Sequence, residues 1–202
     1  MAGERPEYFG DIHRTYEDGA RLVTTPPYTA YLKIAEGCSN GCAFCVIPRL
    51  RGKYRSRSME ALLAEARKLA DSGVKELIVI AQDITRYGLD LEPRTSLAQL
   101  VRELCRLDLH WIRLHYLYPE AVTDELIQVI ASEPKVLHYL DIPIQHCNDR
   151  ILEKMRRRNT RAELEELFDK LRAAMPDVVI RTSLICGLPG EGEAEFEELC
   201  DF

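Results

Sequence analysis

Alternation between strand-like and helix-like segments is the feature that most constrains how this chain can fold. From about residue 29 onward, short apolar runs rich in β-branched residues alternate with stretches whose apolar side chains recur at helical spacing. The runs predict strands over 31–35, 77–81, 111–117, 140–144 and 178–185. Such alternation is typical of parallel strands joined by right-handed helical crossovers. The sequence therefore predicts an α/β fold of about five strand–helix units.

Capping residues mark the starts of several predicted helices. Ser58 precedes one apolar-periodic stretch and is a good N-cap. Two further stretches begin with the spacing of a capping box, in which a Ser or Thr is followed three residues later by Glu or Gln. These pairs are Ser96 with Gln99 and Thr160 with Glu163.

One face of three predicted strands carries polar side chains. Residues two apart on a strand share a face. A closed eight-stranded barrel fills its interior with branched apolar side chains, so a polar inner face favours a partial, open barrel that holds a polar ligand. The alternative is that these groups pair with one another as buried ion pairs. The residues on this face are Arg113 and His115, then Asp141, Pro143 and Gln145, and lastly Arg181 and Ser183.

Length, charge and hydropathy limit the class of protein. The chain has 202 residues, of which 46 % are hydrophobic, and a net charge of −6. We expect one domain over residues 29–202, with 1–28 as a polar, turn-rich lead-in. The acidic balance gives no global attraction to nucleic acid. The sequence has no apolar stretch of the form of a signal peptide or membrane span, so we expect a soluble, cytoplasmic protein.

Three of the seven cysteines lie close together in the sequence. Cys38, Cys42 and Cys45 form a C-x3-C-x2-C set directly after the first predicted strand, at the edge where parallel α/β folds bind ligands. A thiolate suits iron–sulfur clusters, zinc and copper(I). A four-iron cluster needs four ligands, so three local thiolates leave one iron open to a substrate. Structural zinc is the alternative, but it takes four ligands and the other cysteines are scattered.

Other segments carry weaker signals. Five cations lie between residues 49 and 57, where they suit an anionic cofactor group, a redox partner, nucleic acid or simply a solvated loop. A second basic run over 154–158 follows a predicted helix, and the helix dipole explains at least part of it. A Gly/Pro turn over 183–191 ends the last predicted strand, and Gln82 with Asp83 ends the second. Both suit ligand binding or local turn formation.

The cysteine loop resembles the cluster-binding motif of the radical S-adenosylmethionine superfamily, including the aromatic Phe44 before the third cysteine. Segments 31–38, 47–52 and 56–58 resemble the methylthiotransferases of that superfamily. Segments 25–28 and 82–88 are similar to the members that modify an aspartate of a small-subunit ribosomal protein. The tRNA-modifying members tend to have Gln-Asn where this chain has Gln82-Asp83. The resemblance extends over nearly the whole chain from about residue 20.

The resemblance implies a fold and two cofactors. The fold is an open, partial (β/α)6-type barrel, here truncated to about five strand–helix units. The cofactors are a 4Fe-4S cluster, held by the three loop cysteines, and S-adenosyl-L-methionine, which chelates the fourth iron. Reductive cleavage of S-adenosylmethionine then gives a 5′-deoxyadenosyl radical that abstracts hydrogen from the substrate for methylthiolation. The cofactors bring the radical chemistry, and the protein orients them.

The resemblance also implies contacts to S-adenosylmethionine. Phe44 packs beside the cluster or the adenine, and Ile185 with Gly187 contacts the adenine. Gln82 stands near the methionyl amino group.

The remaining implied contacts are polar. Gln145 and Ser183 meet polar atoms of the ribose or methionine, and Arg181 pairs with the carboxylate.

The resemblance finally implies partners and further domains. The substrate is a small-subunit ribosomal protein, and the reductant is a low-potential donor of flavodoxin or ferredoxin type. No membrane is involved, and RNA contact would come from a further domain. Full-length members add an N-terminal domain with a sulfur-donating auxiliary cluster and a C-terminal TRAM domain, so we expect this chain to be a radical SAM domain incomplete at its C-terminus. The alternatives are a tRNA (adenosine) methylthiotransferase and a structural zinc-binding domain without catalysis.

Overall fold

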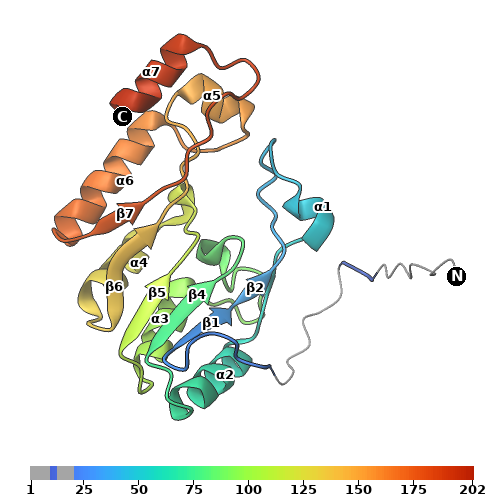
Figure 1. The fold of residues 1–202 in the computed structure, drawn as a ribbon, viewed down its shortest axis with the longest axis vertical. Coiled ribbons are helices and arrows are strands. Elements are labelled where there is room, and N and C mark those ends of the chain that lie inside the picture. Colours follow the sequence, from blue (N-terminus) through green and yellow to red (C-terminus); the bar gives the residue numbers. More distant parts are fainter. Residues whose placement is uncertain (1–9, 13–20) are drawn as a thin grey trace, which may run out of the picture.

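A five-stranded parallel sheet forms the centre of the computed structural model, which describes residues 10–12 and 21–202 (Figure 1). Each strand pairs in parallel with the next one in the order β1-β4-β5-β6-β7. The predicted α/β fold is confirmed, and the sheet is open rather than closed. The strands are β1 (Thr29–Lys33), β4 (Glu76–Ile80), β5 (Trp111–Leu114), β6 (Val136–Asp141) and β7 (Val179–Arg181).

Four helices connect successive strands and cover one face of the sheet (Figure 1). They are α2 (Met59–Asp71), α3 (Leu97–Cys105), α4 (Asp124–Ser132) and α6 (Arg161–Ala174). The remaining elements lie toward the carboxyl ends of the strands, where Figure 1 shows α1, α5 and α7. These elements are β2 (Ala35–Glu36), α1 (Ile47–Arg51), β3 (Arg55–Ser56), η1 (Ile84–Arg86), η2 (Pro119–Ala121), α5 (Asp149–Lys154) and α7 (Glu193–Asp201).

The predicted lead-in over residues 1–28 falls mostly outside the described residues. Among the helices that are described, none has both the length and the apolar character needed to cross a membrane.

The core lies between the sheet and the four connecting helices. Leu32, Leu77 and Leu114 on the strands are fully buried, and so are Leu62 on α2 and Leu100 on α3. Burial of apolar side chains at this interface supplies the main favourable free energy of folding. The other face of the sheet has no helical cover in Figure 1 and is therefore free to carry polar groups.

Two of the three predicted helix starts form as expected. The Ser58 hydroxyl accepts a hydrogen bond from the Ala61 backbone N–H, and Thr160 with Glu163 forms a complete capping box. The box predicted at Ser96 is only half formed. Its hydroxyl accepts from the Gln99 N–H at 3.2 Å, but the Gln99 side chain accepts from the hydroxyl of Thr95 instead.

The fourth strand lies earlier in the chain than predicted. It spans Val136–Asp141 rather than 140–144. Pro143 has no N–H to donate, so a ladder cannot continue through it. The chain instead turns at Gln145, whose φ is +73°, and makes an isolated bridge with Leu184 beyond the end of β7.

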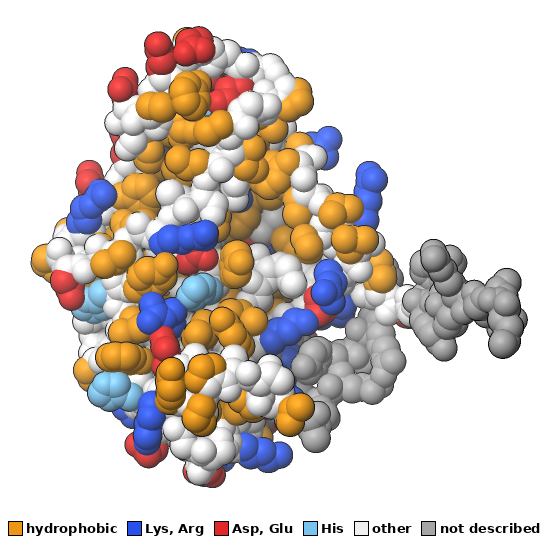
Figure 2. Space-filling view, viewed as in Figure 1, with side chains coloured by type: hydrophobic (Ala, Val, Ile, Leu, Met, Phe, Trp, Pro, Cys, Tyr) orange, Lys and Arg blue, Asp and Glu red, His pale blue; other side chains and the backbone are white. Residues whose placement is uncertain are grey.

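Several polar residues predicted on the inner face pair with one another. Arg113 lies 2.7 Å from the carboxylate of Glu76, and Arg181 lies 2.7 Å from that of Asp141. The Nδ1 of His115 is 3.9 Å from the same Asp141 carboxylate. Figure 2 shows charged and histidine side chains gathered among apolar ones on this uncovered face. For these residues, therefore, the alternative of paired charges describes the structure.

We expect replacement of the α6 cap to destabilise the fold measurably. Thr160→Ala removes the hydroxyl that accepts from the Glu163 N–H, and the loss of such a cap costs about 1 kcal/mol. Thr160→Ser keeps the hydroxyl and is the matched control. Urea unfolding of the two variants measures the difference, and equal free energies of unfolding would contradict this role of the cap.

Candidate functional site

The cysteine loop is attached to the end of β4 by a side-chain network. The Asn40 amide donates to the fully buried carboxylate of Asp83 at 2.8 Å, and the Asn40 carbonyl accepts from Arg86 Nε at 2.8 Å. The same carboxylate caps η1 by accepting from the Thr85 N–H. A residue inside the loop is thus bonded to two residues just beyond β4. This network fixes the loop over the carboxyl end of the sheet.

Backbone contacts hold the loop at its start. The Cys38 N–H donates to the Gly52 carbonyl at 3.2 Å. Gly37 has a φ of +77°, and a Cβ on it would lie 2.3 Å from the Lys53 carbonyl oxygen. Only glycine fits this close approach. The loop therefore leaves β2 along a path that any side chain at residue 37 would block.

The far side of the loop contacts the segment after α5. The Ala43 N–H donates to the Met155 carbonyl at 3.0 Å. The Cys42 sulfur lies 2.9 Å from the hydroxyl of Tyr118. The guanidinium of Arg157 stacks 3.8 Å from the centre of the Tyr118 ring. Cys42 is thus placed by a tyrosine that an arginine holds from the other side.

The three cysteines line one cavity of about 470 Å³ at the carboxyl ends of the strands. Phe44, Gln82, Gln145 and Ser183 line the same cavity. These residues come from four separate parts of the sequence and were each predicted as site residues. Parallel strands bring their carboxyl ends to one edge of the sheet, and this edge is where such folds bind ligands.

Three other predicted site residues do not line this cavity. Arg181 is bonded to Asp141, its partner in the β6–β7 register. Ile185 and Gly187 lie on the segment that continues from Ser183, outside the lining residues. Their predicted roles toward S-adenosylmethionine stay predictions.

Arg157 and Tyr118 line the cavity and were not predicted. Arg157 is 7 % exposed and donates to the Pro143 carbonyl at 2.8 Å. Arg157 belongs to the basic run after α5, for which the sequence indicated only a helix-dipole role. No spacing pattern in the sequence distinguishes Arg157 from its neighbours, whereas the tertiary structure turns its side chain inward over Tyr118.

The cavity presents buried polar atoms that have no partner in the protein. They are the Oε1 of Gln82 and the Nε of Arg157. A buried polar atom without a hydrogen bond is costly, so such atoms indicate a ligand that satisfies them. One is an acceptor and the other belongs to a cation. The cavity residues thus offer one acceptor and one cationic donor that the protein itself leaves without a partner.

The donor set fits a cluster better than a single zinc ion. All three loop cysteines are free thiols. Structural zinc takes four protein ligands, whereas three thiolates on a cubane, each on a different iron, leave the fourth iron open.

Burial raises the pKa of the Cys38 thiol above its ordinary value, and the charges of Asp83, Cys42 and Cys45 act in the same direction. The thiol therefore favours its protonated form until a positive metal centre replaces the proton. Because a ligating thiol must lose its proton, metal binding at this residue releases one.

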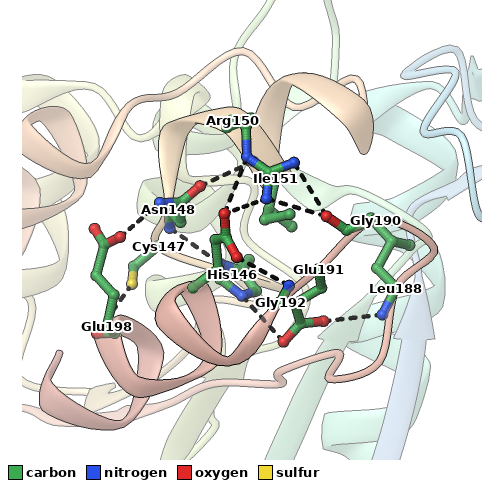
Figure 3. A network of polar contacts seen from close by, with 11 residues as sticks. His146, Cys147, Asn148, Arg150, Ile151, Leu188, Gly190, Glu191, Gly192 and Glu198 are labelled. Carbon is green, nitrogen blue, oxygen red and sulfur yellow. Dashed lines mark hydrogen bonds and ion pairs between the residues drawn. The ribbon is translucent and has the colours of Figure 1, made fainter.

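A second network, next to the cavity, holds the turn that follows Ser183 (Figure 3). The Asn148 N–H donates to His146 Nδ1 at 3.0 Å, so the neutral ring carries its proton on Nε2. This Nε2 lies 3.6 Å from Glu191 Oε1, and both side chains are buried. The other Glu191 oxygen accepts from the Leu188 N–H at 2.9 Å. The bond from the Leu188 N–H thereby closes the turn over 188–191, and the buried Glu191 carboxylate lies beside the ring of His146.

Comparison with known proteins identifies the family to which this chain belongs. The family model described as the radical SAM superfamily matches residues 32–202. The chain belongs to the radical SAM superfamily. Its cofactors are accordingly a [4Fe–4S] cluster and S-adenosylmethionine, as the cysteine loop predicted.

The curated relatives of this radical SAM chain are longer proteins. Three examples are called ribosomal protein uS12 methylthiotransferase RimO. The identity is 56 % over 197 residues with the one from Citrifermentans bemidjiense, covering 96 % of this chain and 44 % of the relative. It is 54 % for Geobacter sulfurreducens (98 % and 45 %) and 47 % for Clostridium acetobutylicum (99 % and 45 %). The chain therefore spans less than half the length of these relatives.

Solved structures share the fold at low identity. The methyltransferase TsrM from Kitasatospora setae, with tryptophan and a SAM analogue bound, has a TM-score of 0.71 at 18 % identity over 90 % of this chain and 37 % of TsrM. The cobalamin-dependent radical enzyme OxsB, with aqua-cobalamin and S-adenosylmethionine bound, has a TM-score of 0.66 at 16 % identity over 85 % of this chain and 26 % of OxsB. Both likenesses support the open radical SAM fold.

We expect Glu191→Gln to loosen the turn over 188–191. A glutamine offers one carbonyl oxygen where Glu191 offers two acceptors, so its amide N–H would face either the Leu188 N–H or His146 Nε2. Leaving a buried donor without an acceptor costs about 1–3 kcal/mol. Hydrogen exchange should accelerate at Leu188 relative to the control Glu197→Gln, an exposed change on α7. Unchanged exchange would show that the Glu191 carboxylate does not hold the turn.

We expect Cys147 to resist alkylation although it lies near the cavity. Its side chain is fully buried, and burial raises the pKa of its thiol to about 11. At about pH 8, roughly one molecule in a thousand then carries the thiolate, which is the reactive form. Iodoacetamide labelling followed by peptide mass spectrometry should find the exposed Cys186 and Cys200 modified first. Labelling of Cys147 at the same rate would contradict the structure.

Proposed function

We propose that the cavity binds S-adenosylmethionine against a [4Fe–4S] cluster held by Cys38, Cys42 and Cys45. The observation that carries this proposal is that three free thiols share one cavity with unpartnered buried polar atoms. Three thiolates leave one iron open, and the polar atoms lie around the space next to them. When bound and reduced, the cluster supplies the electron that cleaves S-adenosylmethionine to methionine and a 5′-deoxyadenosyl radical.

The protein's own part is to bind and orient the cofactor. We propose that the Gln82 carbonyl oxygen accepts from the methionyl amino group. Arg157 and Lys33 are the cations that line the cavity. Lys33 is paired with Glu36, so the guanidinium of Arg157 is the group suited to the methionyl carboxylate. This assignment gives Arg157 the role predicted for Arg181, which is already paired with Asp141. Arg157 is held by its bond to the Pro143 carbonyl and by stacking on Tyr118, which favours a single bound geometry.

The remaining lining residues suit the rest of the cofactor. Gln145 and Ser183 offer polar side chains to the ribose or the methionine, and Phe44 offers an aromatic face to the adenine. Ile185 and Gly187 follow Ser183 on the same segment, and we retain their predicted contact with the adenine. Apolar lining from Ile80 and Leu117 keeps water from the reacting atoms.

We propose that the whole protein is a methylthiotransferase acting on an aspartate of a small-subunit ribosomal protein. Support comes from relatives about half identical to the chain that are named for ribosomal protein uS12. A tRNA substrate is not favoured by these names, and the donor set does not favour structural zinc. Sulfur insertion would draw on the portion of the protein that the relatives carry beyond the matched span. The electron would come from a low-potential donor of flavodoxin or ferredoxin type.

Product analysis tests the radical chemistry. The chain is reconstituted anaerobically with iron and sulfide, reduced with dithionite and incubated with S-adenosylmethionine, and 5′-deoxyadenosine is quantified by mass spectrometry. We expect product from the wild type, none from Cys42→Ala, which removes a cluster ligand, and wild-type levels from Cys186→Ala, which changes an exposed thiol. Absence of product from the wild type, or equal product from Cys42→Ala, would overturn the proposal.

A further inference from the structure

Two neighbouring arginines point to opposite sides of the cysteine loop. Arg157 is buried and lines the inner cavity. Arg156 lines a separate hollow on the outer side of the loop. Arg156 has a φ of +56°, an uncommon conformation for a residue other than glycine. Since the preceding Met155 carbonyl accepts from the Ala43 N–H, this turn sits directly against the loop.

The outer hollow has a volume of about 490 Å³ and reaches two of the three cluster cysteines. Phe44 is 40 % exposed and Val46 is 54 % exposed, so the floor of the hollow presents apolar surface. The residues that line it are Gly41, Cys42, Ala43, Phe44, Cys45, Val46, Pro48, Arg49 and Arg156. Cys42, Phe44 and Cys45 line the inner cavity as well. The cysteine loop thus lies between the inner cavity and the outer hollow, and the outer hollow is open to a partner.

The outer hollow carries unpaired positive charge on an acidic protein. The guanidinium groups of Arg49 and Arg156 make no hydrogen bond or ion pair with any described residue. The chain as a whole has a net charge of −6, so an acidic partner is repelled by most of the surface and attracted here. Figure 2 shows Lys and Arg side chains projecting from the edge where Figure 1 places α1. A local patch of this kind steers an acidic partner to one orientation.

We propose that the outer hollow, with Arg49 and Arg156 on its rim, is the docking face for a small acidic protein that donates one electron at low potential. This inference rests on the proposed function, which requires an electron at the cluster. A reduced flavin hydroquinone on the donor loses one electron and one proton and becomes a neutral semiquinone. The cluster gains that electron and passes from its 2+ to its 1+ state, the proton goes to solvent, and no bond in this chain forms or breaks.

The geometry favours an electron donor over other acidic partners. Redox complexes have small interfaces, and a small apolar hollow with a charged rim suits such an interface. A nucleic acid would need a longer stripe of cations to follow its phosphates, and the hollow has two. The hollow also opens on the cysteines themselves, so a donor seated there has a short path to the cluster.

The test compares two double variants of the full chain. Arg49→Gln with Arg156→Gly removes both rim charges, and glycine accepts the φ of residue 156. Arg67→Gln with Lys68→Gln removes two exposed charges on α2, which lies away from the cysteine loop (Figure 1). Binding of an acidic bacterial flavodoxin is measured by calorimetry on the cluster-free chain at low ionic strength. We expect the Kd to rise about tenfold in the rim variant, to stay unchanged in the α2 variant, and to rise with salt for the wild type.

Reduction kinetics on the cluster-loaded chain separate docking from radical chemistry. We expect the rate constant for reduction by flavodoxin hydroquinone to fall about tenfold in the rim variant. Reduction by the methyl viologen radical, a small cation that needs no acidic docking face, should be as fast as in the wild type. Equal flavodoxin binding by both variants, equal losses in both, or tighter binding of a single-stranded RNA than of flavodoxin would overturn the proposal. Failure to hold a cluster would count against the proposed function alone, because the binding measurement does not use the cluster.

Discussion

The hydrogen bond between the Asn40 amide and the buried Asp83 carboxylate is the contact on which the site most depends. Asp83 directly follows Gln82, a cavity residue, and caps η1 through the Thr85 N–H. Because Asp83 is fully buried, its carboxylate is costly to place there unless donors surround it. Asn40 and Arg86 supply donors around it. Folding of the sheet therefore fixes the position of the cysteine loop before any cofactor binds.

Polar residues within the strands stabilise the sheet, whereas those beyond the strand ends line the cavity. Within the strands, Arg113 pairs with Glu76 and Arg181 pairs with Asp141. Beyond the strand ends, Gln145 and Ser183 face the cavity. The Glu191 carboxylate, which accepts from the Leu188 N–H, then closes the turn behind these two residues. The ion pairs thus hold the strands next to the cavity, and the polar groups that line the cavity can bind a ligand.

The order of strands and helices and much of the cavity follow from sequence patterns. Cys38, Cys42 and Cys45 were expected at the ligand-binding edge because they follow the first parallel strand, and this reasoning needs only local periodicity. Gln82 and Ser183 were expected beside the cofactor from the family resemblance, and they line the same cavity.

The sequence was less informative about residues whose position depends on strand register or on an unusual backbone conformation. Arg181 lies opposite Asp141 because of the β6–β7 register, which depends on packing across the whole sheet. Arg157 turns inward after the positive φ of Arg156, and nothing in the run of arginines indicates which one is buried. β6 ends at Asp141, before Pro143. The apolar pattern over residues 140–144 predicted a strand there because it does not take the missing N–H of proline into account.

The central claim is that the three loop cysteines are the complete set of protein ligands to the cluster. It is tested most directly by replacing Cys105, Cys186 and Cys200 with serine and Cys147 with alanine in one variant. After anaerobic reconstitution, iron and sulfide are measured per chain, and the reduced sample is examined by electron paramagnetic resonance with and without S-adenosylmethionine. The account predicts about four irons and four sulfides per chain and a signal that changes when S-adenosylmethionine is added. Loss of iron from this variant, or a signal indifferent to S-adenosylmethionine, would contradict it.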